Sequence, residues 1–256
     1  MTLLSRCALA ALAAAAPLAA QCTAPQYTAA GVVNSASYVA GWLAPNTFAS
    51  IFGTNLAQGT ANGQPGAQGD VAGVHVEVNS LPAFVSYASP DQVNFVVPSY
   101  ITGTSANVVV VRDGCPGPSV TVVLHDLAPA LFLDVDAVTV IALHQNGGVV
   151  SQQSPAHAGE AIVLFATGLG PYTMPTEDDF VPPPTGDWIA LAAEFQVLVN
   201  GQAVNSNAIQ YVGSAPLWIG LFQIDLVLPA SVPSNPEIRI GLGSVLSPPG
   251  TVLPVD

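Results

Sequence analysis

The sequence predicts an all-β protein built from two tandem β-sandwich domains, and three observations support this. Apolar and polar residues alternate with a period of two, as in Gly73–Asn79, which is typical of a strand with one buried face. Glycine and proline each occur 23 times in 256 residues and interrupt the apolar runs at short intervals. Three motifs of the first half of the chain also return, in the same order, in the second half.

The first twenty residues have the layout of a secretory signal peptide. Met1–Arg6 carries one positive charge, Cys7–Ala20 is an apolar run rich in alanine and leucine, and small residues precede Gln21. This run is too short for a transmembrane helix. We therefore expect residues 1–20 to be removed and the mature protein to be secreted or held at the cell surface. Gln21 in front of Cys22 disfavours a lipoprotein anchor, because a small residue is expected at that position.

Removal of the leader leaves two cysteines, Cys22 and Cys115. In an oxidising compartment this number favours one disulfide, which would tie the mature N-terminus to the turn Asp113–Gly117. The alternatives are two free thiols, or the loss or lipidation of Cys22.

Strands are expected along the whole mature chain. Gly73–Asn79 alternates for seven positions, and the valine-rich segments Ser105–Asp113 and Ser119–Leu124 flank a Gly/Pro turn and predict a hairpin. No segment after the leader sustains a helical period of 3.6 residues.

Internal similarity sets the number of domains. The matched segments are Ala44–Leu56 with Ala158–Leu169, Val76–Asn79 with Val197–Asn200, and Gln92–Pro98 with Gln223–Pro229. The separation between matches widens along the chain, which predicts two loop insertions in the second copy. We expect one domain over residues 24–127 and a second over residues 128–256, packed with limited hinge freedom because the join has no Ser/Gly linker. Gly53 and Gly168 are expected to adopt a positive φ where the chain leaves the sheet.

The segment Ser50–Leu56 resembles the signature strand of IPT/TIG domains, which are immunoglobulin-like sandwiches. A wider set of motifs resembles a family of uncharacterised exported bacterial proteins of acidobacterial type: Val33–Tyr38, Ser50–Leu56, Gln92–Pro98, Gly159-Glu160, Phe165–Gly170 and Gly220–Ile224. Asp225, in place of an expected Asn, and Trp42-Leu43, in place of a Pro-Gly start, depart from the pattern. The resemblance implies the architecture and export, and no activity, because the family has none assigned.

The charge of the chain excludes several functions. Three Lys+Arg against 16 Asp+Glu give a formal net charge of −13, and all three cations are arginines. Such a chain cannot form the cationic surface that nucleic acids or anionic membranes require. After the leader, no apolar stretch is long enough to cross a membrane.

The sequence contains no catalytic or metal-binding motif that we recognise. There is no Gly-x-Ser-x-Gly elbow, no His-Glu-x-x-His and no Cys-x-x-Cys. His75 alternates with valines and is expected to face solvent, and His157 with Glu160 and His144 makes a weak case for a metal. The acidic clusters Asp134–Asp136 and Glu177–Asp179 leave calcium open. We therefore predict no cofactor, no metal site and no enzymatic activity, with an extracellular hydrolase as a remote alternative.

The two predicted insertions concentrate aromatic residues. Pro171–Trp188 is a Pro-rich loop with three aromatics, and Tyr211–Trp218 adds two more. Because function gathers on the loops of rigid scaffolds, Tyr172, Trp188 and Trp218 are candidate ligand-binding residues. The competing interpretation, which we favour, is that these rings pin the loops to the sandwich. The polar residues that recur outside the buried face, Gln92 and Asn94 with Gln223 and Asp225, are likewise more typical of an ordinary outer face than of a binding strip.

These observations favour a secreted or surface-associated binding or adhesion module without enzymatic activity. Extracellular polysaccharide is the candidate ligand, and a cell-surface protein is the candidate partner. The alternative is a structural component of the cell surface or matrix that assembles through sheet edges. The sequence leaves the oligomeric state open.

Overall fold

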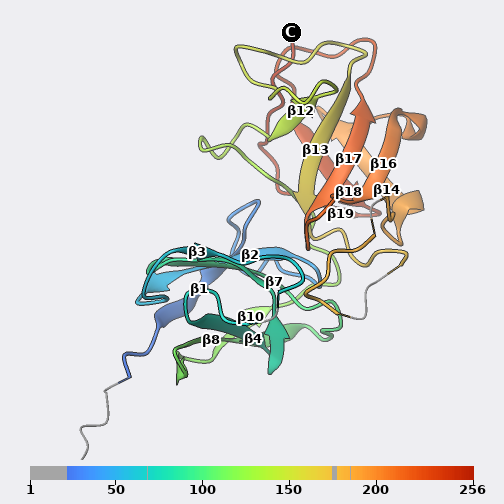
Figure 1. Ribbon diagram of the computed structural model, residues 1–256. Helices are drawn as coiled ribbons and strands as arrows, with labels where there is room; N and C mark the ends of the chain where they lie inside the picture. Colours follow the sequence, from blue (N-terminus) through green and yellow to red (C-terminus); the bar gives the residue numbers. More distant parts are fainter. Residues whose placement is uncertain (1–21, 68, 175–177, 185) are drawn as a thin grey trace, which may run out of the picture.

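The structure, a computed structural model, describes residues 22–67, 69–174, 178–184 and 186–256. Two immunoglobulin-like β-sandwiches form the lower and upper lobes of Figure 1, so the predicted fold class is confirmed. Across the described ranges, helical structure is limited to two short 3-10 turns, Ala192–Glu194 and Ser206–Ala208. None of these residues belongs to a helix long and apolar enough to cross a bilayer. The predicted signal peptide, residues 1–20, lies outside the described residues.

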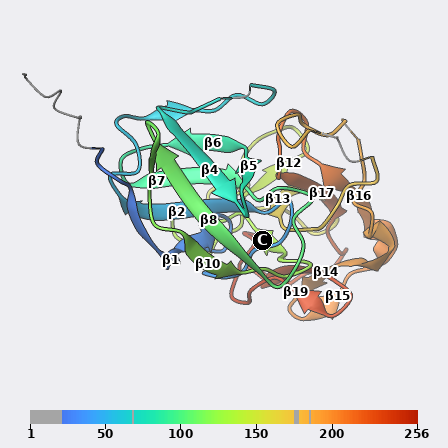
Figure 2. The same ribbon diagram turned by 90° about the horizontal axis from the view of Figure 1, so that it is seen from below.

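The first sandwich consists of two antiparallel sheets, which lie one above the other in Figure 1 and cross one in front of the other in Figure 2. Sheet A has the strand order β1 (Gln26–Asn34), β2 (Phe48–Thr54), β7 (Gln92–Val96), β6 (Val85–Ala88) and β3 (Ala61–Asn62). Sheet B has the order β10 (Val120–Val123), β8 (Ser105–Arg112), β4 (Val74–Val78) and β5 (Leu81–Ala83), and β9 (Cys115–Pro116) pairs with β8. The predicted hairpin is therefore the β8–β10 pair.

The second sandwich repeats this arrangement. Sheet C has the order β11 (Ala130–Leu131), β13 (Ala161–Thr167), β17 (Phe222–Val227) and β16 (Ile209–Ser214), and β12 (Ala142–His144) pairs with β13. Sheet D has the order β15 (Gln202–Ala203), β14 (Phe195–Val199), β18 (Ile238–Leu242) and β19 (Val245–Leu246). The strands of the two sandwiches fall on either side of the predicted boundary between residues 127 and 128.

Each sandwich has its own apolar core, made by the inward residues of its two sheets. In the first core Ile51, Val93 and Phe95 of sheet A meet the inward valines of β4 and β8. In β4, burial alternates residue by residue, as the sequence predicts, and His75 lies on the half-buried outer side. The second core is built the same way around residues such as Phe222 and Ile240. Burial of these side chains stabilises each sandwich by about 25 cal/mol per Å² removed from water.

The motif Val-x-Val-Asn performs the same task in both copies. Asn79 and Asn200 follow β4 and β14 with φ of 50° and 48°. Each side-chain oxygen accepts a hydrogen bond from the backbone of the neighbouring strand, Asn107 N–H and Glu237 N–H respectively, both at 2.8 Å. Asparagine is among the residues that tolerate the left-handed region, so it can turn the chain and pin the next strand.

The expectation for the two glycines is half right. Gly168 has a φ of +74°, but Gly53 does not adopt a positive φ, and Asn55 takes that conformation with a φ of 61°. What both glycines share is crowding by backbone. A Cβ atom would lie 2.3 Å from the carbonyl oxygen of Gln26 at Gly53 and 2.1 Å from that of Ala128 at Gly168.

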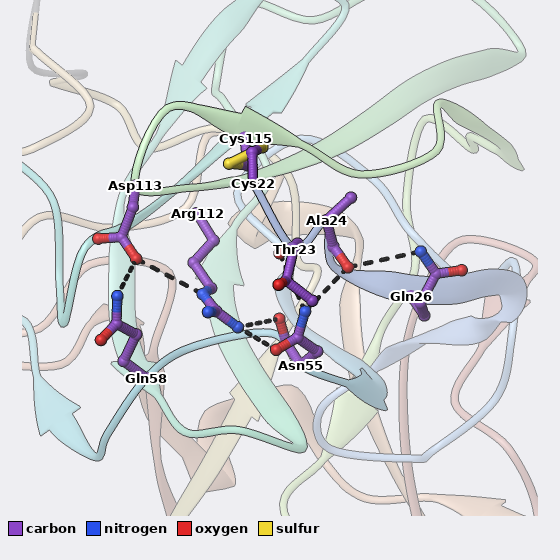
Figure 3. Close-up of a disulfide and its surroundings, with 9 residues drawn as sticks. All are labelled: Cys22, Thr23, Ala24, Gln26, Asn55, Gln58, Arg112, Asp113 and Cys115. Atoms are coloured by element: carbon purple, nitrogen blue, oxygen red, sulfur yellow. Dashed lines mark hydrogen bonds and ion pairs between the residues drawn. A yellow bond between two sulfur atoms is a disulfide. The ribbon is translucent and has the colours of Figure 1, made fainter. Parts of the chain in front are cut away.

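The predicted disulfide is present. Cys22 and Cys115 are bonded with their Cα atoms 5.8 Å apart, across 93 residues of sequence (Figure 3). Asn55 holds the same N-terminal segment, because its Nδ2 donates to the carbonyl oxygens of Thr23 and Ala24 at 3.0 Å each. Arg112 in turn donates from Nη1 to the Asn55 side chain and backbone oxygens (Figure 3). The bridge and this network together fasten the segment Cys22–Ala24 to the first sandwich.

Candidate functional site

The structure does not bring the three predicted aromatic residues together. Tyr172 is only 7% exposed and stacks on Phe222 in the core with ring centroids 4.9 Å apart, so its ring packs against the sandwich and does not line a ligand site. Trp188 is 41% exposed and packs edge-on against Tyr211 at 5.3 Å. Trp218 is 51% exposed and lines a cleft between the two sandwiches. Of the three, only Trp218 stands in a concave site.

The cleft exists because the second sandwich stands on the outer face of sheet A (Figure 1). Side chains that point out of β2 and β7, Phe48 and Val96, form an apolar cluster with Phe84 and with residues of the second sandwich, including Ile219. Two edge-to-face contacts, each at 6.2 Å, join the halves: Phe48 with Phe132, and Phe84 with Phe180 of the first insertion. Phe180, within the predicted insertion, therefore braces the interface.

Buried and half-buried hydrogen bonds fix the two sandwiches relative to each other. The backbone N–H of Phe48 donates to Thr167 Oγ1 at 2.7 Å, and that hydroxyl donates to the carbonyl oxygen of Gly220 at 2.8 Å. The indole of Trp42 donates to the carbonyl oxygen of Pro129 at 3.1 Å. Unmaking such bonds in a buried place is costly, so the cleft is preformed.

The loop that carries Trp218 depends on one glycine. Gly220 has a φ of +72°, and a Cβ atom there would lie 2.8 and 3.0 Å from the methyl groups of Val96 on sheet A. Leu217 next to Trp218 also has a positive φ, 67°, and is 77% exposed. A positive φ at an exposed leucine costs free energy, and such strain gathers at functional sites.

The cleft has a volume of about 820 Å³, within the range of small-ligand sites. Sheet A and the adjoining segment 62–65 form its floor, and Phe132, Pro182 and the loop around Trp218 form its wall. The lining residues are Phe48, Asn62, Gly63, Gln64, Pro65, Phe84, Ser86, Tyr87, Asn94, Phe132, Pro182, Leu217, Trp218 and Leu221.

A polar row crosses this floor at right angles to the strands. The register places Asn62 opposite Tyr87, Tyr87 opposite Asn94, and Asn94 opposite Ser50. Asn94 Oδ1 accepts from Ser50 Oγ at 2.9 Å and from Gln92 Nε2 at 2.8 Å, which leaves the Nδ2 group of Asn94 without a partner among the described residues.

Further polar groups at the cleft have no hydrogen-bond partner within the described part of the chain. They are the side chains of Asn62 and Gln64, the hydroxyl of Tyr87 and the indole N–H of Trp218. The cleft thus combines exposed aromatic rings with free donors and acceptors. In the sequence, Gln92 and Asn94 recur as Gln223 and Asp225 and are more typical of an ordinary outer face, and nothing in that pattern showed that the second sandwich would stand beside this strip.

A second cluster brings together Ser154, His144 and Glu160 at the distances of a catalytic triad. His144 Nδ1 lies 2.6 Å from Glu160 Oε1, and Nε2 lies 3.2 Å from Ser154 Oγ. However, Nε2 also lies 3.1 Å from the Ser154 carbonyl oxygen, which can only accept. An imidazolium, with a proton on both ring nitrogens, satisfies all of these contacts, and in that form Nε2 cannot take a proton from the serine. The cluster is a clamp rather than an activated nucleophile.

The clamp changes the pKa values of both its ionisable members. The hydrogen bond with Glu160 raises the pKa of the His144 imidazole above its ordinary value, although partial burial opposes the change. Burial alone would raise the pKa of Glu160, but hydrogen bonds from His144 and from the backbone N–H of His157 outweigh it and lower the pKa.

The acidic segments do not form a metal site in the described residues, where no group of three or more His, Cys, Asp or Glu side chains is arranged for an ion. In the first acidic segment Asp136 binds Thr139 and the backbone of Val138. In the second, Glu177 lies outside the described residues, and Asp179 accepts a hydrogen bond from the backbone of Ser99 at 3.0 Å.

Comparisons with known proteins find no matching family model and no matching curated protein. Among solved structures, the chain is similar to Bacteroides ovatus SGBP-B of a mixed-linkage glucan utilization locus, in complex with a mixed-linkage heptasaccharide (11% identity, TM-score 0.35, 84% of this chain and 42% of that one). It is also similar to the surface glycan-binding protein PbSGBP-B of Prevotella bryantii (13%, TM-score 0.25, 81% and 37%) and to tandem Ig repeats of Dlar (11%, TM-score 0.24, 91% and 95%).

The chain spans less than half the length of the two glycan-binding proteins. At these values the similarity concerns the fold alone, and the nature of the site has to be inferred from its own residues.

Proposed function

We propose that this protein is a secreted or surface-associated module that binds carbohydrate, without catalysis, in the cleft between its two sandwiches. The observation that carries the proposal is the position of Trp218, an exposed indole that lines the same cleft as a floor of unpaired amide side chains. A sugar ring has an apolar face and a polar edge. The aromatic wall suits the face, and the donors and acceptors of Asn62, Gln64 and Asn94 suit the hydroxyl groups.

The same cleft offers nothing for glycoside hydrolysis. That reaction needs two carboxyl groups on opposite sides of the scissile bond, and the described residues that line the cleft include no carboxylate.

The alternative of assembly through sheet edges has less support. Edge strands β3, β5, β11, β15 and β19 have two or three residues and edge strand β10 has four. The longer edge strands β1 and β16 are partly covered by the bridges Val33–Ala40 and Trp188–Gly213. Membership of the exported bacterial family that the motifs resemble is part of the same proposal.

The test compares two exposed tryptophans of the second sandwich. Trp218→Ala should abolish or strongly weaken retention on polysaccharide, by about 2 kcal/mol or roughly thirtyfold, which is typical of an aromatic hot spot. Trp188→Ala is the matched control, because Trp188 is similarly exposed and does not line the cleft. Affinity electrophoresis through gels that contain a panel of polysaccharides measures both. Retention that is equal in the two variants would refute the proposal.

A further inference from the structure

We infer, on the basis of the proposed carbohydrate function, that the ligand is an uncharged polysaccharide chain that lies across the strands of sheet A. The charge of the cleft is the first observation that points to it. None of the described lining residues carries a charge at neutral pH, and the polar contacts they offer are amides, hydroxyls and an indole N–H. Neutral donors and acceptors suit the hydroxyl groups of a neutral glycan.

No cation is in place to receive an anionic chain. The sequence has no lysine, and both described arginines are engaged elsewhere. Arg112 donates to Asn55 and lies 3.5 Å from an oxygen of Asp113, and Arg239 donates to the carbonyl oxygen of Ser247. A carboxylate or sulfate that entered the cleft would lose hydration without gaining a counter-charge, which is strongly unfavourable.

The exit of the cleft adds repulsion. A smaller hollow of about 250 Å³ shares Asn62, Gly63, Gln64 and Phe84 with the cleft and continues to Asp70. An extended chain that leaves past Gln64 therefore meets a carboxylate, on a protein whose net charge is −13. Charged groups in or beside an interface mainly decide which partners are rejected.

The polar row also sets the direction and the minimum length of the ligand. Asn94, Tyr87 and Asn62 come from the adjacent strands β7, β6 and β3, so the row runs across the sheet. Neighbouring strands are about 4.8 Å apart, and the outer members of the row are therefore about 10 Å apart. A single sugar ring cannot contact both, whereas an oligosaccharide can.

The experiment uses pairs of polymers with the same backbone. The mature protein is run through gels that contain uncharged polysaccharides, such as hydroxyethyl cellulose, xylan, mannan and dextran, and then through gels with the carboxymethylated or sulfated derivative of each polymer that retains it. We expect at least one uncharged polymer to retain the protein and its anionic derivative to bind at least about tenfold more weakly. Binding to the uncharged polymer should be the same at about 0.05 and 0.5 M salt, because no charge is screened. Oligosaccharides of that polymer should compete, and its monosaccharide should not.

A gain-of-function variant provides the second arm. Gln64→Lys places a cation in the exposed floor segment 62–65, at a side chain with no hydrogen-bond partner among the described residues, and should improve binding of the anionic derivative several-fold in low salt only. Equal retention of charged and uncharged polymers, with both lost in Trp218→Ala, would overturn this inference and leave the proposed function standing. The absence of retention by every polymer, or retention that survives Trp218→Ala, would overturn both.

Discussion

Gly220 is the position at which a single methyl group should test the geometry of the cleft. In Gly220→Ala the new Cβ would lie 2.8 and 3.0 Å from the two methyl groups of Val96 and 3.2 Å from the carbonyl oxygen of Asn46, so the loop or sheet A must shift. This overpacking should cost about 1–3 kcal/mol. The residue also has a φ of +72°, which adds about 1–2 kcal/mol for any residue with a side chain. We expect a total loss of about 2–5 kcal/mol and weaker ligand binding, because the same loop carries Trp218.

Two further variants separate these contributions. Gly201 has a φ of +75°, and no atom lies within 4 Å of the place that a methyl group would take there, so Gly201→Ala should lose only the backbone part, about 1–2 kcal/mol. Val96→Ala removes the two methyl groups that Gly220→Ala would strike, at a cost of roughly 2 kcal/mol for the lost packing. The double variant of Gly220 and Val96 should then be more stable than the sum of the single effects predicts, by about 1–3 kcal/mol.

Urea unfolding followed by circular dichroism and tryptophan fluorescence gives the free energies of unfolding of the parent and the four variants. A cost of Gly220→Ala no larger than that of Gly201→Ala would refute this packing of the loop. Additive effects of Gly220→Ala and Val96→Ala would refute it equally, because the loop would then not be seated against β7.

Three other changes test features outside the cleft. Replacing Cys22 and Cys115 by serine should lower the free energy of unfolding by about 2–5 kcal/mol, since the disulfide closes a long loop. Reducing the parent protein should give the same loss in urea unfolding, and a urea midpoint that neither change moves would contradict this prediction. Tyr172→Phe should be neutral or stabilising by up to about 1 kcal/mol, because the buried hydroxyl has no partner among the described residues; a loss above about 1 kcal/mol would contradict it. Because the pKa of His144 is raised, its contribution to stability is complete below about pH 6.5 and fades as the pH rises through the pKa of the folded state. Because the pKa of Glu160 is lowered, its contribution is complete above about pH 4.5 and fades as the pH falls through the pKa of the folded state. His144→Gln should therefore lose about 1 kcal/mol between these values and less at higher pH, and a loss independent of pH would argue against the ion pair.

Local patterns were enough to predict the sandwiches. Alternation fixes which face of β4 is buried, and the Gly/Pro turn between β8 and β10 can only close a hairpin, so both follow from a few adjacent residues. The disulfide followed from counting, because the sequence has two cysteines after the predicted leader. The expected positive φ at Gly53 was wrong because this position requires glycine for a different reason. The neighbouring strand β1 leaves no room for a side chain there, and a local sequence pattern does not encode such crowding.

The site could be predicted only in part, because it belongs to neither sandwich alone. Trp218 stood out as an aromatic residue in an insertion, but Tyr172 and Trp188 had the same signature and are placed elsewhere. Trp218 differs from the other two residues because it lies beside the outer face of sheet A. Asn94 and Tyr87 come from strands more than a hundred residues away, and they meet Trp218 only because the second sandwich packs on sheet A. Packing between domains depends on contacts between residues far apart in sequence, and the local hydrophobic periodicity does not predict such contacts.

The duplication itself supplies the sharpest substitution for the binding row. Gln92 donates to Asn94 in sheet A at 2.8 Å, and Gln223 donates to Asp225 in sheet C at 2.7 Å, so the second copy shows that aspartate fits this position. In Asn94→Asp the Oδ1 contacts can persist, and stability should change by less than about 1 kcal/mol.

The free Nδ2 donor is lost in the same variant, and a negative charge enters the uncharged cleft. We expect binding of the uncharged polysaccharide to fall by about tenfold or more, a cost of about 1.5–3 kcal/mol, with a urea midpoint close to that of the parent. Asp225→Asn, which makes the reverse exchange outside the cleft, should leave binding unchanged. If Asn94→Asp binds as the parent does, the ligand does not touch the floor of sheet A, and Trp218 would hold it against some other surface.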